Sequence, residues 1–142
     1  ACVALYGVYD ILNRFGHWPG QGMRPTFERL IAKSTKESDP ARWSKVNPLD
    51  LVHADVPPTF LLHGKKDSLV PVEESRVFAD ALRKVSKNAV LLAEVDDAQH
   101  AFEIFHSVRG RYAVQAIEHF LKAVVARRRE ARTALEDRTA AQ

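Results

Sequence analysis

The chain has 142 residues, which is enough for one domain of ordinary size. Hydrophobic residues make up 46% and charged residues 27% of it, so extended disorder and a collagen-like structure are excluded. It holds no run of about 18 apolar residues that could cross a membrane. Its single cysteine, Cys2, excludes an internal disulfide and any zinc site that needs several cysteines.

The net charge of +3 lies mostly at the C-terminal end. Residues 127–138 contain five arginines and three acidic residues, a local net charge of +2. Such a run is typical of a solvated helix, with a lipid- or nucleic-acid-binding segment as the alternative. No nucleic-acid-binding motif accompanies it, so we expect no nucleic-acid partner. We therefore divide the chain into a globular part, 1–126, and a basic helical or frayed tail, 127–142.

Three short apolar runs, each ended by turn-forming residues, predict three β-strands at residues 1–6, 59–63 and 89–95. The first run is apolar throughout, which is typical of a strand buried on both faces in a parallel sheet. It has neither a basic segment nor a cleavage motif, so it is not a signal peptide. A signal or anchor would lie upstream, and the localisation is left unassigned.

Helical periodicity separates these strands. Apolar residues at 77–85 fall on one helical face, with Pro71 near the start and Glu73 and Glu74 suited to the positive end of the helix dipole. A second apolar stripe predicts a helix that begins near Ser107 or Val108 and runs into the basic tail. The first half of the chain is less regular, and short helices are expected near residues 27–31, 42–43 and 48–52.

This order of strands and helices predicts an α/β fold with about three parallel strands and flanking helices. A three-stranded sheet exposes the edge of its first strand unless another strand covers it. We therefore expect this edge to pair with another part of the same protein or with a second copy in a homodimer.

Polar residues follow the three predicted strands, at the sheet edge where parallel α/β proteins carry their functional groups. Asp67 and His100 lie about one strand–helix–strand unit apart, and a right-handed crossover brings both to the same edge. The Asp67 carboxylate can then bind one imidazole nitrogen of His100, while the other nitrogen is free to accept a proton from a nucleophile. Their alternative roles are a turn-forming or helix-capping aspartate and a solvated loop histidine.

The same residues carry a family resemblance. The segment His63–Pro71, HGKKDSLVP, resembles the acid-loop motif HG-x-x-D-x-x-V-P of α/β-hydrolases, and His100 with Phe102 resembles their H-x-F histidine loop. The chain is most similar to the C-terminal part of hormone-sensitive-lipase-like esterases, followed by acyl-peptidases of the prolyl-oligopeptidase type. The resemblance implies a partial α/β-hydrolase fold, a Ser–Asp–His triad, an acyl ester substrate and no metal or organic cofactor.

The chain departs from the family pattern at the nucleophile. None of its six glycines brackets a serine as in G-x-S-x-G, and the glycine motif of the oxyanion hole is absent. The family order places both upstream of Ala1. The resemblance thus implies the C-terminal portion of a serine esterase or lipase, whose partner is the missing N-terminal half and which has little or no activity alone. The alternatives are an acyl-peptidase or amidase of the same fold, and a non-catalytic α/β assembly module.

Five apolar positions beside these loops are candidates to line a substrate pocket, with ordinary core as their alternative role: Val8, Tyr9, Val70, Phe102 and Phe105. We expect a packed, hydrogen-bonded His63, since it ends a buried strand. Ser68 lacks the elbow of a nucleophile. Asp96 and Asp97 shape a turn or substitute for the acid. The remaining histidines have no ligand spacing, so we expect no metal site; they are His17, His53, His106 and His119.

Overall fold

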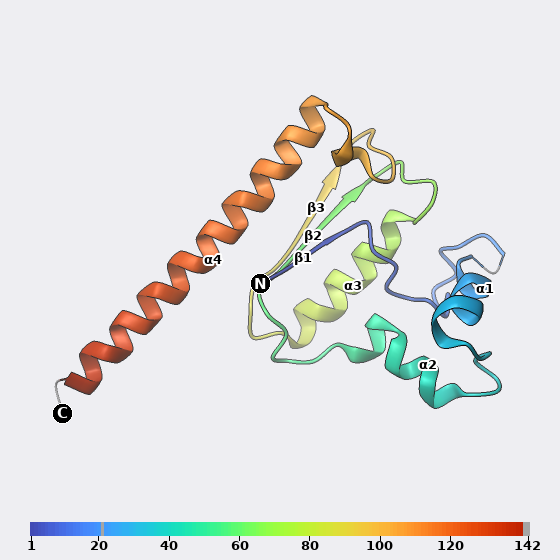
Figure 1. The fold of residues 1–142 in the computed structure, drawn as a ribbon, viewed down its shortest axis with the longest axis horizontal. Helices are drawn as coiled ribbons and strands as arrows, with labels where there is room; N and C mark the ends of the chain where they lie inside the picture. Colours follow the sequence, from blue (N-terminus) through green and yellow to red (C-terminus); the bar gives the residue numbers. More distant parts are fainter. Residues whose placement is uncertain (21, 141–142) are drawn as a thin grey trace.

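The computed structural model describes residues 1–20 and 22–140, which form one parallel sheet flanked by helices (Figure 1). The strands are β1 (Cys2–Leu5), β2 (Thr59–Gly64) and β3 (Val90–Val95), in the spatial order β1-β2-β3. Both neighbouring pairs are parallel, so all three strands end at the same edge of the sheet. The predicted α/β class and the three predicted strands are confirmed.

The strands differ in burial. β2 is central and buried at every residue, whereas Cys2 in β1 is exposed and the rest of that strand is half-buried. In the described residues, β1 pairs with β2 alone. The expected open edge of the first strand is therefore present in this part of the chain. Both faces of β1 pack against the core, with Val3 in contact with the cluster around Phe60 and Ala4 with the cluster around Leu61. The strand is nevertheless only half-buried, because its outer edge has no neighbouring strand among the described residues.

Two helices cover opposite faces of the sheet, α3 (Val72–Val85) and α4 (Val108–Ala140) (Figure 1). Side chains alternate across a strand, and β2 shows it clearly. Phe60 and Leu62 belong to the cluster that includes Ala113 and Phe120 of α4. Leu61, which lies between them, packs in the cluster with Ala79 of α3.

The buried face of α3 is rotated from the predicted one. Ser75, Ala79 and Leu82 are buried, whereas Val85, which the predicted stripe included, is 46% exposed. Because polar residues occupy part of the buried face, apolar periodicity alone does not locate it. The helix bounds themselves agree with the prediction.

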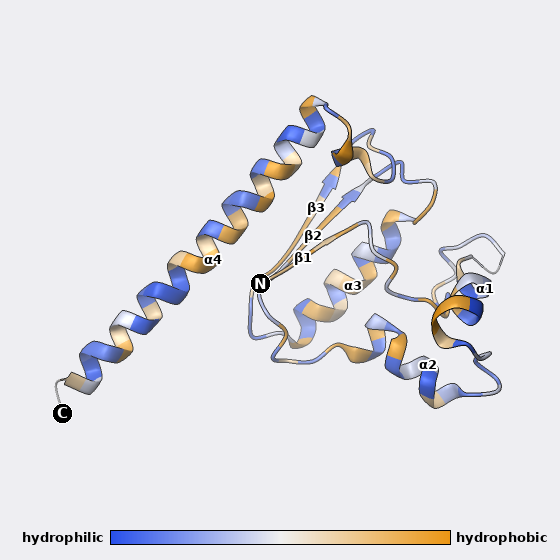
Figure 2. Ribbon diagram, viewed as in Figure 1, coloured by the Kyte–Doolittle hydropathy of each residue, from blue (hydrophilic) through white to orange (hydrophobic). Residues whose placement is uncertain are grey.

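α4 begins where the sequence indicates, and the hydroxyl of Ser107 accepts a hydrogen bond from the backbone N–H of Gly110. The helix continues to Ala140, and its side chains from residue 127 onward are exposed. This distal part is mostly hydrophilic in Figure 2. Residues 141–142 of the predicted tail lie outside the described residues, and the division at residue 126 stays a prediction. In the part of the chain described, no helix combines the length and apolarity of a membrane span.

The segment between β1 and β2 contains two buried tryptophans, Trp18 and Trp43, and consists of short helical pieces. These are α1 (Arg24–Phe27), a π-helical turn (Glu28–Ala32), α2 (Pro40–Val46) and a 3₁₀ turn (Pro48–Leu51). Trp43 is 1% exposed and packs with Ile11 and Ala32. The short helices expected after Pro40 and Pro48 are confirmed, and the one expected near 27–31 is divided between α1 and the π-helical turn.

A buried carboxylate joins this segment to α3. Glu74 is 1% exposed, and its Oε2 accepts hydrogen bonds from the backbone N–H groups of Tyr9 and Asp10 at 2.9 and 2.7 Å. Its Oε1 accepts a third bond from the indole Nε1 of Trp18 at 3.0 Å. The sequence indicated only the favourable dipole position of Glu74. The structure shows that it also holds the chain where it leaves β1.

Candidate active site

Asp67 lies in the loop between β2 and α3, with its carboxylate fully buried. Its Oδ1 accepts hydrogen bonds from the backbone N–H groups of Leu69 and Val70 at 2.9 and 2.8 Å. Its Oδ2 lies 2.8 Å from Nδ1 of His100. The carboxylate thus shapes its own turn with one oxygen and binds the histidine with the other, so the turn contacts and the contact to His100 coexist.

His100 lies in the loop after β3, and 29% of its side chain is exposed. Because an ionised carboxylate only accepts hydrogen bonds, the proton of the neutral ring is on Nδ1 and is donated to Asp67. Nε2 then carries a lone pair, and among the described residues it has no hydrogen-bond partner. An imidazole held in this way can accept a proton at Nε2 from a group placed next to it.

Close backbone contact brings the acid loop and the histidine loop together. A Cβ on Gly64 would lie 2.4 Å from the carbonyl oxygen of Ala98, so only glycine fits at the end of β2. The backbone N–H of Lys66 donates to that same oxygen at 3.0 Å. The two loops are therefore held by main-chain geometry, which fixes the spacing between Asp67 and His100.

Asp96 and Asp97 lie at the turn after β3 and pair with lysines of the acid loop. Asp96 binds Lys65 at 2.7 Å, and Asp97 binds Lys66 at 2.6 Å. Asp97 has a positive φ of 56°, a backbone conformation that aspartate adopts in turns more readily than most other residues. Both carboxylates are exposed, so the pairs add little stability. Their side chains face lysines and not His100, which agrees with the turn-shaping role.

His63 is completely buried next to Asp67, as its position at the end of β2 indicated. Nδ1 lies 2.7 Å from the hydroxyl of Ser75, and Nε2 lies 2.9 Å from the carbonyl oxygen of Val70 and 3.3 Å from Oδ2 of Asp67. Burial lowers the pKa of His63, so this ring is neutral at pH 7. It supports the acid loop from the interior of the protein.

Tyr6 is a neighbour of His100 that the sequence analysis did not single out. It follows β1 directly, its φ is +39°, and its ring centroid lies 4.2 Å from that of His100. Its hydroxyl donates to Oε1 of Glu103 at 2.5 Å. Burial, followed by the hydrogen bond to Glu103 and the negative charges of Glu103 and Asp67, raises the pKa of Tyr6 to about 12. The signal in the sequence that could have identified Tyr6 as a site residue is its position at the carboxyl end of the first predicted strand.

The five apolar candidates do not form one exposed wall. Tyr9 is buried against Phe78, whose ring stacks on it at 4.2 Å. Val70 and Phe102 are 3% and 7% exposed. These three side chains therefore lie in the core, which was their alternative role, because residues distant in the sequence pack on them. Val8 is half-buried beside the cluster around Trp43.

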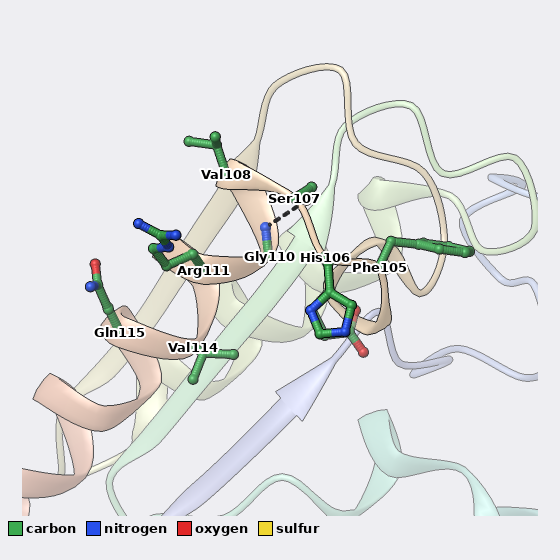
Figure 3. Close-up of a pocket in the computed structure, with 9 residues that line it drawn as sticks. Phe105, His106, Ser107, Val108, Gly110, Arg111, Val114 and Gln115 are labelled. Carbon is green, nitrogen blue, oxygen red and sulfur yellow. Dashed lines mark hydrogen bonds between the residues drawn. The ribbon is translucent and has the colours of Figure 1, made fainter.

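Phe105 is the exception, with 65% of its surface exposed. It lies beside a hollow of about 630 Å³ at the start of α4, which Figure 3 shows together with His106, Val108 and Val114. Glu103 lines the same hollow. Neither Asp67 nor His100 lines this hollow; Glu103 links it to the pair only indirectly, since Glu103 binds Tyr6 and Tyr6 contacts His100.

The other polar candidates lie apart from this pair or have structural contacts. Ser68 donates its backbone N–H to Oε1 of Gln99 at 3.2 Å and has no glycine elbow around it. His17, whose Nδ1 lies 3.9 Å from Glu74, belongs to the segment that Glu74 holds. Over residues 1–20 and 22–140, no three histidine, cysteine or acidic side chains converge as metal ligands would.

Comparison with known proteins assigns the chain to a family. The family model BD-FAE matches residues 1–82, which include β1, β2 and Asp67. The chain belongs to the BD-FAE family. Its similarity to curated proteins extends beyond this BD-FAE match, into the part of the chain that carries His100.

Two curated relatives come from Mycobacterium tuberculosis (strain ATCC 25618 / H37Rv). Probable carboxylic ester hydrolase LipM is 40% identical over 126 residues, which are 89% of this chain and 29% of LipM. Esterase LipQ is 36% identical over 132 residues, which are 93% of this chain and 31% of LipQ. The BD-FAE chain therefore spans less than a third of the length of these relatives.

Solved structures show the same fold. Thermogutta terrifontis esterase 2 phosphonylated by sarin superposes with a TM-score of 0.67 and 26% identity over 87% of this chain and 44% of that one. The acetyl ester-xyloside bifunctional hydrolase of Caldicellulosiruptor lactoaceticus superposes with a TM-score of 0.66 and 25% identity, over 86% of this chain and 41% of that hydrolase chain. The expected kinship with hormone-sensitive-lipase-like esterases of the α/β-hydrolase fold is confirmed, and the two mycobacterial relatives are named as a probable carboxylic ester hydrolase and an esterase.

Proposed function

We propose that this chain supplies the acid and the base of a Ser–Asp–His triad in a carboxylic-ester hydrolase. The observation that carries the proposal is the 2.8 Å contact between Oδ2 of Asp67 and Nδ1 of His100, which leaves Nε2 free. No glycine in the chain brackets a serine, so we place the nucleophile outside residues 1–142. The names of the relatives, carboxylic ester hydrolase and esterase, support the reaction class.

The geometry fits each step of ester hydrolysis. Nε2 of His100 accepts the proton of the serine hydroxyl as the serine oxygen attacks the ester carbonyl. The imidazolium is stabilised by Asp67 and then transfers the proton to the leaving alcohol. Water attacks the acyl-enzyme in the second half of the cycle, with His100 again as base. Backbone N–H groups outside this chain would bind the oxyanion, and these steps need no metal or organic cofactor.

Asp67 suits this role because its orientation is fixed before the reaction. Two backbone N–H groups hold Oδ1, and the neutral His63 ring lies 3.3 Å from Oδ2. A carboxylate held in this way keeps His100 in one tautomer and stabilises the charge that develops on its ring. Among the five apolar candidates, Phe105 and Val8 are the proposed contacts to the acyl or alcohol group, since the other three are buried.

The proposal predicts that turnover needs more than residues 1–142. We expect the full-length protein to hydrolyse 4-nitrophenyl acetate, and the purified 142-residue chain to release nitrophenol no faster than its own His100→Ala variant. The reason is that the base has no serine to activate. The measurement is the initial rate of nitrophenol release, followed by absorbance, for equal molar amounts of the three proteins. Robust turnover by the isolated chain above its His100→Ala control would contradict the proposed placement of the serine.

An acyl-peptidase or amidase is the first alternative, because the same triad cleaves both kinds of bond. A 4-nitrophenyl ester and a 4-nitroanilide of the same acyl group, given to the full-length protein, separate the two. If the protein is an ester hydrolase, kcat/KM for the ester should exceed kcat/KM for the anilide by much more than the ratio of the intrinsic reactivities of the two bonds. Equal or greater preference for the anilide would favour the amidase.

The open edge of β1 favours a second alternative, a non-catalytic assembly module that pairs this edge with a second copy. The discriminating observation is the coding sequence upstream of Ala1. An in-frame G-x-S-x-G motif there supports the triad. If a start codon directly precedes Ala1, no serine elbow is supplied by this chain, and edge pairing becomes the leading explanation of the fold.

A further inference from the structure

We propose that Tyr6, held by Glu103, is a positioning residue for the His100 imidazole. This inference rests on the proposed role of His100 as the base. Two segments that are distant in the sequence meet at this point: the end of β1, and the stretch after β3 that carries His100 and continues into the 3₁₀ turn Phe102–Ile104. The Tyr6 ring contacts His100 at a centroid distance of 4.2 Å and an interplanar angle of 54°.

The backbone of Tyr6 indicates that its placement is imposed by its surroundings. Its φ of +39° lies in the left-handed region, which residues with a side chain rarely adopt. Such conformations are retained only where the surrounding structure fixes them, and they cluster at active sites. Here the hydrogen bond from Tyr6 N to the carbonyl oxygen of Leu62, at 2.8 Å, ties this residue to β2.

Glu103 is the group that orients the Tyr6 ring. Its Oε1 accepts the phenolic hydrogen bond at 2.5 Å, within the range of a strong bond to an ionised acceptor. Its Oε2 is buried and has no hydrogen-bond partner among the described residues. Glu103 as a whole is half-buried, and a carboxylate oxygen that is shielded from water without a partner is unfavourable for folding. Glu103 is therefore poorly explained as a stabilising residue and well explained as the anchor of Tyr6.

The pair adds a constraint on His100 that Asp67 does not provide. A single hydrogen bond at Nδ1 leaves the imidazole free to pivot about the line that joins it to Oδ2. Contact with the Tyr6 ring limits this motion and keeps Nε2 directed toward its target. The same contact is within the range of a cation–π interaction, so it strengthens when the imidazole becomes charged. An interaction that is stronger in the transition state raises kcat more than it lowers KM.

The test compares four variants of the full-length protein with a nitrophenyl ester as substrate. Tyr6→Leu removes the ring, Tyr6→Phe removes only the hydroxyl, and Glu103→Gln keeps an acceptor oxygen for Tyr6. Tyr112→Leu is the matched control, because Tyr112 is a 65% exposed tyrosine on α4. Circular dichroism and the thermal midpoint establish that each variant is folded.

We expect Tyr6→Leu to lower kcat by about 10²-fold, the typical effect of a small misplacement of a reacting group, with little change in KM. The kcat of Tyr6→Phe should fall between those of Tyr6→Leu and the wild type, and the kcat of Glu103→Gln should be closer to the wild-type value. Tyr112→Leu should have the wild-type kcat. A folded Tyr6→Leu with wild-type kcat, or one with a raised KM alone, overturns the inference.

If Tyr6→Leu does not fold, the nearly isosteric variants decide the matter. Tyr6→Phe and the double variant Tyr6→Phe/Glu103→Gln should have the same kcat, since both lack the phenolic hydrogen bond. If the losses in kcat from the two single substitutions add up in the double variant, Tyr6 and Glu103 do not act as a pair. His100→Ala separates this inference from the proposed function. An inactive His100→Ala with a normal Tyr6→Leu overturns the positioning role alone, whereas an active His100→Ala overturns the proposed function.

Discussion

Replacing Asp67 by asparagine in the full-length protein should lower kcat for a nitrophenyl ester by about 10⁴-fold, by analogy with the same change in a serine protease. Oδ1 of Asp67 accepts hydrogen bonds from two backbone N–H groups, so the amide oxygen of the asparagine would take the place of Oδ1 and keep these two bonds. The amide N–H₂ would then face Nδ1 of His100 and donate to it. The imidazole proton would move to Nε2, where it blocks the acceptance of a proton from serine.

Asp97→Asn is the matched control for this prediction. Asp97 is a neighbouring carboxylate, but it is exposed and pairs with Lys66 at 2.6 Å. Its replacement should leave kcat within about twofold, since exposed ion pairs contribute little. The fold should survive in both variants because the turn contacts of residue 67 are retained. Near-normal turnover of Asp67→Asn would remove Asp67 from the triad.

Glu74→Ala should lower the free energy of unfolding by about 3–5 kcal/mol, because it leaves buried hydrogen-bond donors without an acceptor. Three donors depend on this carboxylate: the N–H groups of Tyr9 and Asp10 and the indole of Trp18. Glu74→Gln should lower the free energy of unfolding less, because its amide oxygen still accepts hydrogen bonds from the two backbone N–H groups. Only the indole N–H of Trp18 would then face another donor, the new amide N–H₂. The measurement is urea unfolding of the full-length protein, followed by tryptophan fluorescence.

Glu73→Ala tests whether burial is the cause. Glu73 is the preceding residue of α3, and its side chain is 43% exposed in a pair with Arg76. Its loss should change the unfolding free energy by less than about 1 kcal/mol. Equal effects of the two alanine substitutions would mean that the three buried bonds do not carry the stability assigned to Glu74.

Periodicity and topology were sufficient for the framework of the site. The apolar runs located the strands, because a strand buried among helices needs apolar side chains on both faces. The right-handed crossover then predicted that the loops of Asp67 and His100 meet at one edge. That prediction depends only on chain direction and spacing, and the 2.8 Å contact agrees with it.

Contacts that depend on three-dimensional packing were not predictable in this way. Tyr6 reaches His100 only because its backbone turns left-handed directly after β1, and nothing in the run before Gly7 encodes that turn. Glu74 has the sequence position of an ordinary first-turn acid, yet a loop from another part of the chain covers it. The sequence left Tyr9 open between a pocket wall and the core, because its position against Phe78 depends on how α3 is rotated.

The most direct test of the central claim, that Asp67 and His100 serve a serine nucleophile, is covalent labelling of the full-length protein by a fluorophosphonate. Thermogutta terrifontis esterase 2, to which this chain is structurally similar, is phosphonylated by sarin. We expect wild type and a His119→Ala control to be labelled at one serine within a G-x-S-x-G motif, as peptide mass spectrometry would show. His100→Ala should lose this labelling, because no base activates the serine. Equal labelling of His100→Ala and wild type, or no labelled serine in either, would contradict the account.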